Sequence, residues 1–216
     1  MLDKKGFDKW AGNYDESIIP CLNAFPFDGY YDVLSAVISL SDPEEGLRIL
    51  DVGIGTGLLS EELRKSGCII HGIDFSEKML EKARIRISDG IFEIVDVSID
   101  HFGKFNNNRY DRIITSYFFH HLNPHQQTSF VKRSLKENLL PDGKLIIADI
   151  GFENESDYEA ARVKFQDGWE DDEFYLCGES IVYNLQTEKI KAQYIQISCC
   201  AGILVCTFKP DYENHR

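Results

Sequence analysis

Long apolar runs are missing from this 216-residue chain. A membrane-spanning helix needs roughly 18 to 20 consecutive apolar residues, and no stretch approaches that length, so we expect no membrane partner. The N-terminal stretch MLDKKGFDKWAGNYD carries acidic side chains and has no apolar core of the kind found in secretion signals. We therefore expect a cytoplasmic protein, and the length suits one domain with a sizeable core.

Regularly spaced cysteines are lacking too. The chain has no C-x-x-C pair, and its six cysteines stand at positions 21, 68, 177, 199, 200 and 206. A zinc site or a disulfide framework would need a more regular pattern. His121 and His125 have a spacing that suits a metal on a helix, but Pro124 interrupts them and no H-E-x-x-H glutamate is present. The sequence therefore predicts no metal site.

Positive charge is scarce. The chain has 23 Lys and Arg against 36 Asp and Glu, which gives a formal net charge of −13. Such a surface repels phosphate backbones and anionic lipids. The charge therefore counts against nucleic acid and membranes as partners, and it favours a small, neutral or cationic molecule. Acidic stretches at 153–157 and 170–173 would attract a cation, although such runs are usually solvated faces or loops.

Short apolar segments alternate with amphipathic ones from residue 47 to residue 150. We predict strands at 47–52, 68–73, 91–95, 110–116 and 144–150, and helices at 58–66, 76–88 and 124–139, with a tight turn at 141–143. The strands are near-continuous apolar runs, which is typical of a parallel sheet covered on both faces. Strands that alternate with helices in this way indicate βαβ units and a doubly wound sheet.

The flanking segments differ from this alternating core. Residues 3–15, 24–40 and 153–188 have helical patterns, and the last of these is rich in acids. Two β-rich runs, 191–198 and 202–208, are separated by three residues, which indicates an antiparallel hairpin. The predicted fold is α/β: a Rossmann-like doubly wound sheet, mostly parallel, with an antiparallel C-terminal hairpin.

The segment LDVGIGTG, residues 50–57, lies between a predicted strand and a predicted helix. Its glycines permit a tight turn and a close approach of the backbone to a ligand, and the first N–H groups of the helix favour an anion. The dinucleotide fingerprint is G-x-G-x-x-G. Here the glycines stand at 53, 55 and 57, and Leu58 occupies the place of the last one. This spacing counts against a nicotinamide oxidoreductase.

Carboxylates follow the next two predicted strands. Asp74 stands about 20 residues after Gly53, where an acid accepts both hydroxyls of a ribose; the alternative is that Asp74 caps the next helix. Asp96 can accept the exocyclic amino group of an adenine, or it is an ordinary turn residue. Phe75 and Val97 would then give the adenine apolar cover. Together the loop and the two acids predict an adenosyl-binding site.

Five segments carry a family resemblance. In chain order, LDVGIGTG, GIDFSEKML, Asp96, DRIITS and LLPDGKLIIADI resemble the successive motifs of class I S-adenosylmethionine-dependent methyltransferases. The resemblance covers about residues 47–150, and the closing hairpin extends it to the seven-stranded sheet of that class. FDKWAGNYD and TSYFFHHL are similar to segments of the YrrT-type subgroup of bacterial methyltransferases.

The resemblance implies S-adenosylmethionine as the cofactor. It implies that Gly53 and Gly55 face the methionine part, Asp74 the ribose and Asp96 the adenine. It also implies that Ser116 lies near the methionyl group and that Tyr14 closes over it from a lid helix. The cofactor-binding residues predicted in this way are Tyr14, Gly53, Gly55, Gly57, Asp74, Phe75, Met79, Asp96, Val97 and Ser116.

The loop after the fourth predicted strand supplies the candidates for catalysis. The methyl group of a sulfonium is already activated, so alignment and exclusion of water are the main tasks, and a general base helps only when the acceptor arrives protonated. His120 and His121 titrate near neutrality and are candidates for that base; the alternative is that they cap a helix or bond to backbone. Tyr117 is a candidate for contact with the sulfonium, with core packing as its alternative.

The sequence thus predicts methyl transfer to a small-molecule acceptor. Ser116-Tyr117-Phe118-Phe119 is not the N/D-P-P-aromatic motif of base-amino methylation, and no Pro-Cys pair of a cytosine-methylating enzyme occurs there. The alternative function is a non-catalytic sensor or partner protein that binds the cofactor.

As a single domain, 1–216, the chain would comprise a helical lid at 1–40, the cofactor-binding core at 47–150, a helical substrate lid at 151–188 and the hairpin at 190–209. The acceptor atom and the oligomeric state stay open.

Overall fold

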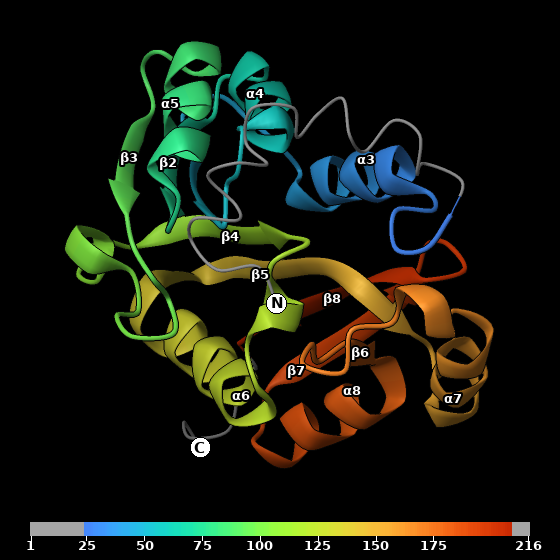
Figure 1. Cartoon of the computed structure of the whole chain (residues 1–216). Coiled ribbons are helices and arrows are strands. Elements are labelled where there is room, and N and C mark those ends of the chain that lie inside the picture. Colours follow the sequence, from blue (N-terminus) through green and yellow to red (C-terminus); the bar gives the residue numbers. More distant parts are fainter. Residues whose placement is uncertain (1–23, 209–216) are drawn as a thin grey trace, which may run out of the picture.

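One mixed sheet organises the molecule. The computed structural model describes residues 24–208, and in this part eight strands form a sheet, seven of them in the order β3-β2-β1-β4-β5-β8-β7 (Figure 1). Strands β1 to β5 are parallel, whereas β8 is antiparallel to both β5 and β7. This arrangement confirms the predicted fold class. The strands are β1 Arg48–Val52, β2 Ile69–Asp74, β3 Ile91–Ile94, β4 Tyr110–Ser116, β5 Leu139–Phe152, β6 Leu176–Cys177, β7 Lys191–Gln196 and β8 Ala201–Thr207.

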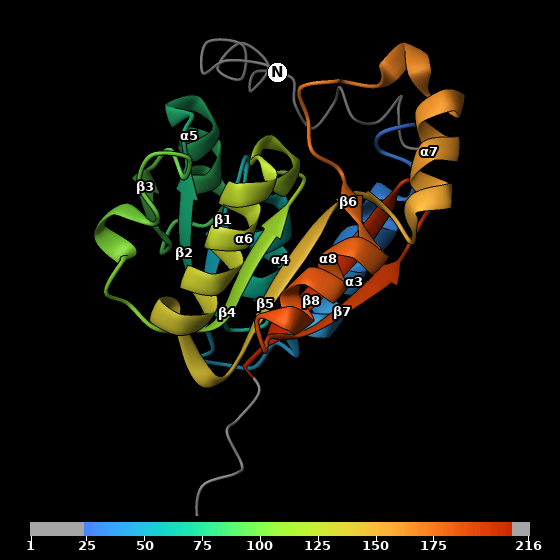
Figure 2. The same cartoon turned by 90° about the horizontal axis from the view of Figure 1, so that it is seen from below.

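Helices cover both faces of the sheet (Figures 1 and 2). One face carries α3 (Tyr30–Ser41), α4 (Leu58–Lys65) and α5 (Glu77–Arg86), and the other carries α6 (Pro124–Arg133) and α8 (Gly178–Thr187). The helix α7 (Glu155–Lys164) packs at the carboxyl end of β5. Among the described residues, no helix is both long and apolar enough to cross a membrane.

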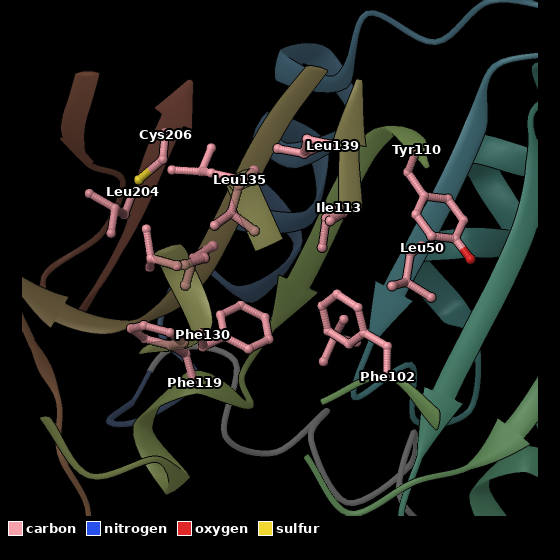
Figure 3. Close-up of a cluster of buried hydrophobic side chains, with 14 of the residues drawn as sticks. Leu50, Phe102, Tyr110, Ile113, Phe119, Phe130, Leu135, Leu139, Leu204 and Cys206 are labelled. Atoms are coloured by element: carbon pink, nitrogen blue, oxygen red, sulfur yellow. The ribbon is translucent and has the colours of Figure 1, made fainter. Parts of the chain in front are cut away.

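The strands are apolar on both sides because successive side chains point to opposite faces. Leu50 and Ile113 belong to the core under α6 and α8, whereas their neighbours Ile49 and Ile114 belong to the core under α3 and α4. Figure 3 shows the first of these cores, in which aromatic and aliphatic side chains from the sheet and from α6 meet. Phe119 is fully buried there. Its ring centroid lies 5.7 Å from that of Phe130, so the loop after β4 is anchored in the core.

The beginnings of the central strands are tied to the end of α3. The Arg112 guanidinium donates to the carbonyl of Ser41 (2.7 Å), and the Lys144 ammonium donates to the carbonyl of Leu40 (3.2 Å). The last carbonyls of a helix have no partner within it and carry partial negative charge, so two cations stabilise this end. These contacts therefore stabilise the edge of the sheet at which the strands start.

Three element predictions need correction. The helix predicted for 124–139 ends as α-helix at Arg133 and continues as a π-helix, Ser134–Asn138. The turn predicted at 141–143 lies inside β5, which starts at Leu139 and shifts its register against β4 between Tyr110 and Arg112. The acid-rich region 153–188 is not one helix, because α7 and α8 are separated by a loop and by β6.

The two helices predicted near the N-terminus have different outcomes. The segment 24–40 becomes helical only at Tyr30, because Gly29 adopts a left-handed conformation (φ 71°) as its N-cap. The helix predicted at 3–15, and with it Tyr14, lies outside the described residues.

Candidate active site

The glycine loop follows β1 and leads into α4. Gly53, Gly55 and Gly57 have φ values of 72°, 57° and 83°, a region that side-chain-bearing residues avoid. The backbone N–H groups of Gly53 and Ile54 donate to the carbonyl of Ile73 (2.8 and 3.0 Å), which fastens the loop to β2. Gly57 is the N-cap of α4. The loop geometry thus depends on glycine at all three predicted positions.

Gly53 and Gly55 differ in how much free space surrounds them. A Cβ on Gly53 would lie 2.8 Å from the side chain of Phe118, so only glycine fits beneath that ring. A Cβ on Gly55 would meet no atom of residues 24–208 within 4 Å. Open space therefore lies next to the second glycine, where a ligand can approach the backbone. This is the fit expected for the predicted cofactor.

Asp74 ends β2 beside the loop. Its carboxylate accepts hydrogen bonds from the backbone N–H groups of Gly55 (2.9 Å) and Ser76 (2.8 Å). The N-cap of α5 is Ser76, whose hydroxyl accepts from the N–H of Met79 (3.3 Å), so Asp74 does not itself cap the helix. A carboxylate accepts about four hydrogen bonds, so holding the loop does not prevent Asp74 from binding a ligand.

Asp51 is a buried carboxyl group close enough to Asp74 to feel its charge, and the sequence analysis did not consider it. It is almost fully buried in β1, and its Oδ2 accepts from the hydroxyl of Ser60 (2.6 Å). Its Oδ1 has no hydrogen-bond partner among the described residues. Burial, opposed by Ser60 and assisted by the charge of Asp74, raises the pKa of Asp51 to about 7. A carboxyl group within an otherwise apolar strand was the signal in the sequence.

The remaining predicted cofactor residues lie around the same strand ends. Asp96 is exposed after β3 and accepts from the N–H and hydroxyl of Ser98 (3.0 and 2.5 Å). Val97 lines a hollow of about 190 Å³ with residues of the α6 region. Phe75 is half-buried, Met79 is buried, and Ser116 is the last residue of β4. Because β1 to β4 are parallel, all these residues follow strands that end at one rim of the sheet.

Of the three catalytic candidates, Tyr117 faces the aromatic side chains near α3. It has a left-handed backbone (φ 51°), and its ring centroid lies 5.1 Å from that of Tyr30 and 5.6 Å from that of Phe27. This packing is the alternative that the sequence left open for Tyr117.

His120 and His121 lie among carboxylates. His120 is buried, and its Nδ1 is 2.5 Å from Oδ1 of Asp149, while its backbone N–H donates to Oδ2 of the same side chain (3.0 Å). Glu173 Oε1 lies 3.8 Å from Nε2 of His120 and 3.7 Å from Nδ1 of His121. The sequence reasoning singled out neither Asp149 nor Glu173 as a site residue, because only the folded chain brings β5 and the segment before β6 to this loop.

The two imidazoles have opposite pKa shifts. Burial alone would lower the pKa of His120, but the charge of Asp149 and the hydrogen bond to it outweigh burial, so the pKa is raised. Burial and the neighbouring His120 lower the pKa of His121 to about 3. His121 is therefore neutral at physiological pH, and one of its two ring nitrogens carries the proton while the other carries a lone pair.

Known proteins match this chain in sequence. The methyltransferase-domain family matches residues 50–147. An uncharacterized methyltransferase of Alkaliphilus oremlandii is 33% identical over 160 residues, which cover 69% of this chain and 68% of that protein. The uncharacterized methyltransferase YrrT of Bacillus subtilis is 33% identical over 157 residues, covering 72% and 70%. The chain belongs to the S-adenosylmethionine-dependent methyltransferases. Membership confirms the family that the motifs predict, and with it the enzyme class and the cofactor of that family.

Solved structures match the methyltransferase in fold. DhpI in its complex with SAH has a TM-score of 0.70 at 14% identity, and the match covers 96% of this chain and 95% of that one. Magnesium protoporphyrin IX methyltransferase from Synechocystis PCC 6803 has a TM-score of 0.70 at 16% identity, covering 96% and 100%. At these identities the likeness shows the shared fold. The roles of the individual site residues stay predictions.

Proposed function

We propose that this methyltransferase transfers the methyl group of S-adenosylmethionine to a small-molecule acceptor by in-line displacement. The observation that carries the proposal is the junction of β1 and β2, where Asp74 accepts from the N–H of Gly55 beside open space. When bound, the cofactor supplies an activated methyl group on a sulfonium. The protein then has to hold the two reactants in line and keep water away.

The strand ends suit the parts of the cofactor. The glycine loop offers backbone and a helix N-terminus to the methionine carboxylate, Asp74 offers its carboxylate to the ribose, and Asp96 offers its own to the adenine amino group. Phe75 and Val97 provide apolar cover. Met79 is a buried residue of α5, so its place in this set is to support the pocket wall.

The acceptor belongs on the side of the loop after β4. Asp149 holds Nδ1 of His120, and this leaves Nε2 as the nitrogen that faces Glu173 and the site. A histidine oriented by a carboxylate can take a proton from an acceptor that arrives protonated. His120 is thus the best placed of the three catalytic candidates, while the net charge of −13 supports a small acceptor over a polyanion.

Calorimetric titration with S-adenosylmethionine tests the cofactor site. The Asp74→Ala variant should bind at least about tenfold more weakly, because hydrogen bonds to a charged group contribute about 1.5–3 kcal/mol each. Asp100→Ala, which removes an exposed carboxylate after β3, is the matched control and should bind like the wild type. Unchanged affinity in a folded Asp74→Ala protein would overturn the assignment.

Transfer of a labelled methyl group tests the acceptor class. The purified enzyme should label a compound in a panel of small metabolites. Labelling of nucleic acid or protein alone would contradict the proposal for the acceptor and leave the cofactor site standing.

A further inference from the structure

Two segments far apart in the chain bring three metal-ligand side chains together beside the acceptor side of the site. His120 and His121 come from the loop after β4, and Glu173 comes from the segment between α7 and β6. One ligand atom from each of the three lies within 4.8 Å of the others. All three side chains have little solvent exposure, at 7%, 19% and 13% respectively.

The cluster is held from several directions. The backbone N–H of Phe174 donates to the carbonyl of His120 (2.8 Å), which fixes Glu173 next to the histidines. The Gln127 side chain of α6 donates to the carbonyls of Phe174 (2.9 Å) and Phe119 (3.3 Å), so it joins the two segments. A ligand set that its surroundings hold in place loses little freedom when it binds.

The donor set suits a borderline divalent ion. Two imidazole nitrogens and a carboxylate oxygen are common ligands of Zn²⁺, Fe²⁺ and their neighbours, whereas Mg²⁺ and Ca²⁺ prefer oxygen alone. A metal-bound histidine usually donates its other ring N–H to a carboxylate. Asp149 accepts in this way from Nδ1 of His120, which leaves Nε2 toward Glu173.

The distances require only a small contraction. Ligands at about 2.0–2.1 Å from a tetrahedral zinc ion stand about 3.3 Å apart. Glu173 Oε1 is 3.8 Å from the His120 nitrogen and 3.7 Å from the His121 nitrogen. The ligand atoms of the cluster all lie within 4.8 Å of one another, so a bound ion would draw them together by about 0.4 to 1.5 Å.

The charges also favour a cation. Asp149 is fully buried and Glu173 nearly so, and two such carboxylates need compensation. The two imidazole rings lie with their centroids 4.0 Å apart, so a cation bound between them and Glu173 would meet both rings.

We infer that His120, His121 and Glu173 bind a divalent transition-metal ion, with Zn²⁺ the best fit, and that Asp149 orients His120 from behind. Three protein ligands leave a fourth position open, as in catalytic zinc sites. The binding of the metal stands independently of the acceptor. That the open position takes a donor atom of the acceptor rests on the proposed function. In the metal-bound form Nε2 of His120 is a ligand and no longer a base, so the ion in place of His120 would promote loss of the acceptor's proton.

Titration with Zn²⁺ against a chromophoric chelator tests the site. A second cluster, Asp28 with Cys199 and Cys200, offers thiols at the hairpin turn, so all proteins carry Cys199→Ser. In this background one equivalent of Zn²⁺ should bind. Glu173→Gln and His121→Ala should each weaken binding at least about tenfold, and Asp149→Asn should weaken it by about 10- to 100-fold. Glu170→Gln and His125→Ala, which change exposed neighbours, are the matched controls.

Substitution with Co²⁺ gives a readout that a purely structural role would not change. The wild-type site should give the visible absorption of nitrogen- and oxygen-ligated cobalt, and Glu173→Gln should alter that spectrum while the protein stays folded. Absence of Zn²⁺ binding in the Cys199→Ser protein, or equal affinity in Glu173→Gln and His121→Ala, overturns the inference. Titration with S-adenosylmethionine on the same proteins separates this outcome from failure of the proposed function.

Discussion

Asp51 is a proton-binding residue inside a strand, and this makes stability depend on pH. Its pKa rises from 3.8 to about 7 on folding, mainly through burial. The folded state therefore holds a proton that the unfolded chain releases, so this contribution is complete below the unfolded pKa and is lost as pH rises through the folded one. In the cofactor-free enzyme, Asp51→Asn should gain stability relative to the wild type between about pH 5 and pH 8, by on the order of 2 kcal/mol.

Urea unfolding at several pH values measures this difference. Asp100→Asn, at an exposed position, is the control and should show a difference from the wild type that does not change with pH. A stability difference for Asp51→Asn that stays constant over this range would show that the carboxyl group keeps its ordinary pKa.

Residues whose role is local were predictable from the sequence. The spacing of Gly53 and Gly55 and the distance to Asp74 describe a loop and the next strand end, and the structure joins the loop to that acid. Asp149 and Glu173 were not predictable, because their importance comes from the partners that tertiary packing gives them. In the sequence, Glu173 is only one of the acids in the stretch 170–173.

At the scale of elements, the capping box of α6 supports the histidine loop. Asn123 accepts from the N–H of Gln126 (3.0 Å), and the Gln126 side chain accepts from the N–H of Asn123 (2.9 Å). Asn123→Ala should lower the free energy of unfolding by about 1 kcal/mol, because the backbone N–H of Gln126 loses its side-chain partner. Thermal or urea unfolding measures this loss of stability, and Asn107→Ala, at an exposed position, is the control. Equal losses in both variants would contradict a capping role.

The end of the same helix shows where local patterns fail. The apolar period continues past Arg133, and it predicts one helix to 139. Asn138 is buried, and its amide donates to the carbonyls of Phe105, Asn106 and Asn108 (3.4, 2.8 and 3.1 Å). These contacts come from a loop thirty or so residues earlier in the chain, and a π-helix at Ser134–Asn138 accompanies them. A helical period carries no information about such distant partners.

At the scale of the whole molecule, the C-terminal hairpin completes the core. Leu204 of β8 is fully buried in the core of Figure 3, while the cofactor loop lies on β1 and β2. Leu204→Ala should lower the free energy of unfolding by about 2–5 kcal/mol and leave the affinity for S-adenosylmethionine unchanged below the unfolding transition. Exposed Gln193→Ala on β7 is the control. A loss of affinity without a loss of stability would place β8 in the binding site.

The order of the strands was predictable only in part. Alternating strands and helices indicate a parallel sheet, and a short connection indicates a hairpin, and both are confirmed. That β8 rather than β7 pairs with β5 follows from which strand is apolar on both faces: β8 is buried almost throughout, whereas β7 is half-exposed.

The cationic clamp of Arg112 and Lys144 on the end of α3 lies at the opposite rim from the glycine loop and the histidines. Substitutions at positions that share no partner and lie more than about 7–10 Å apart usually have additive effects. Substitutions that stabilise the contacts of Arg112 and Lys144 can therefore be made first. The residues around the glycine loop and the histidines can then be varied to accept new acceptors, with the added stability offsetting the stability that those changes cost.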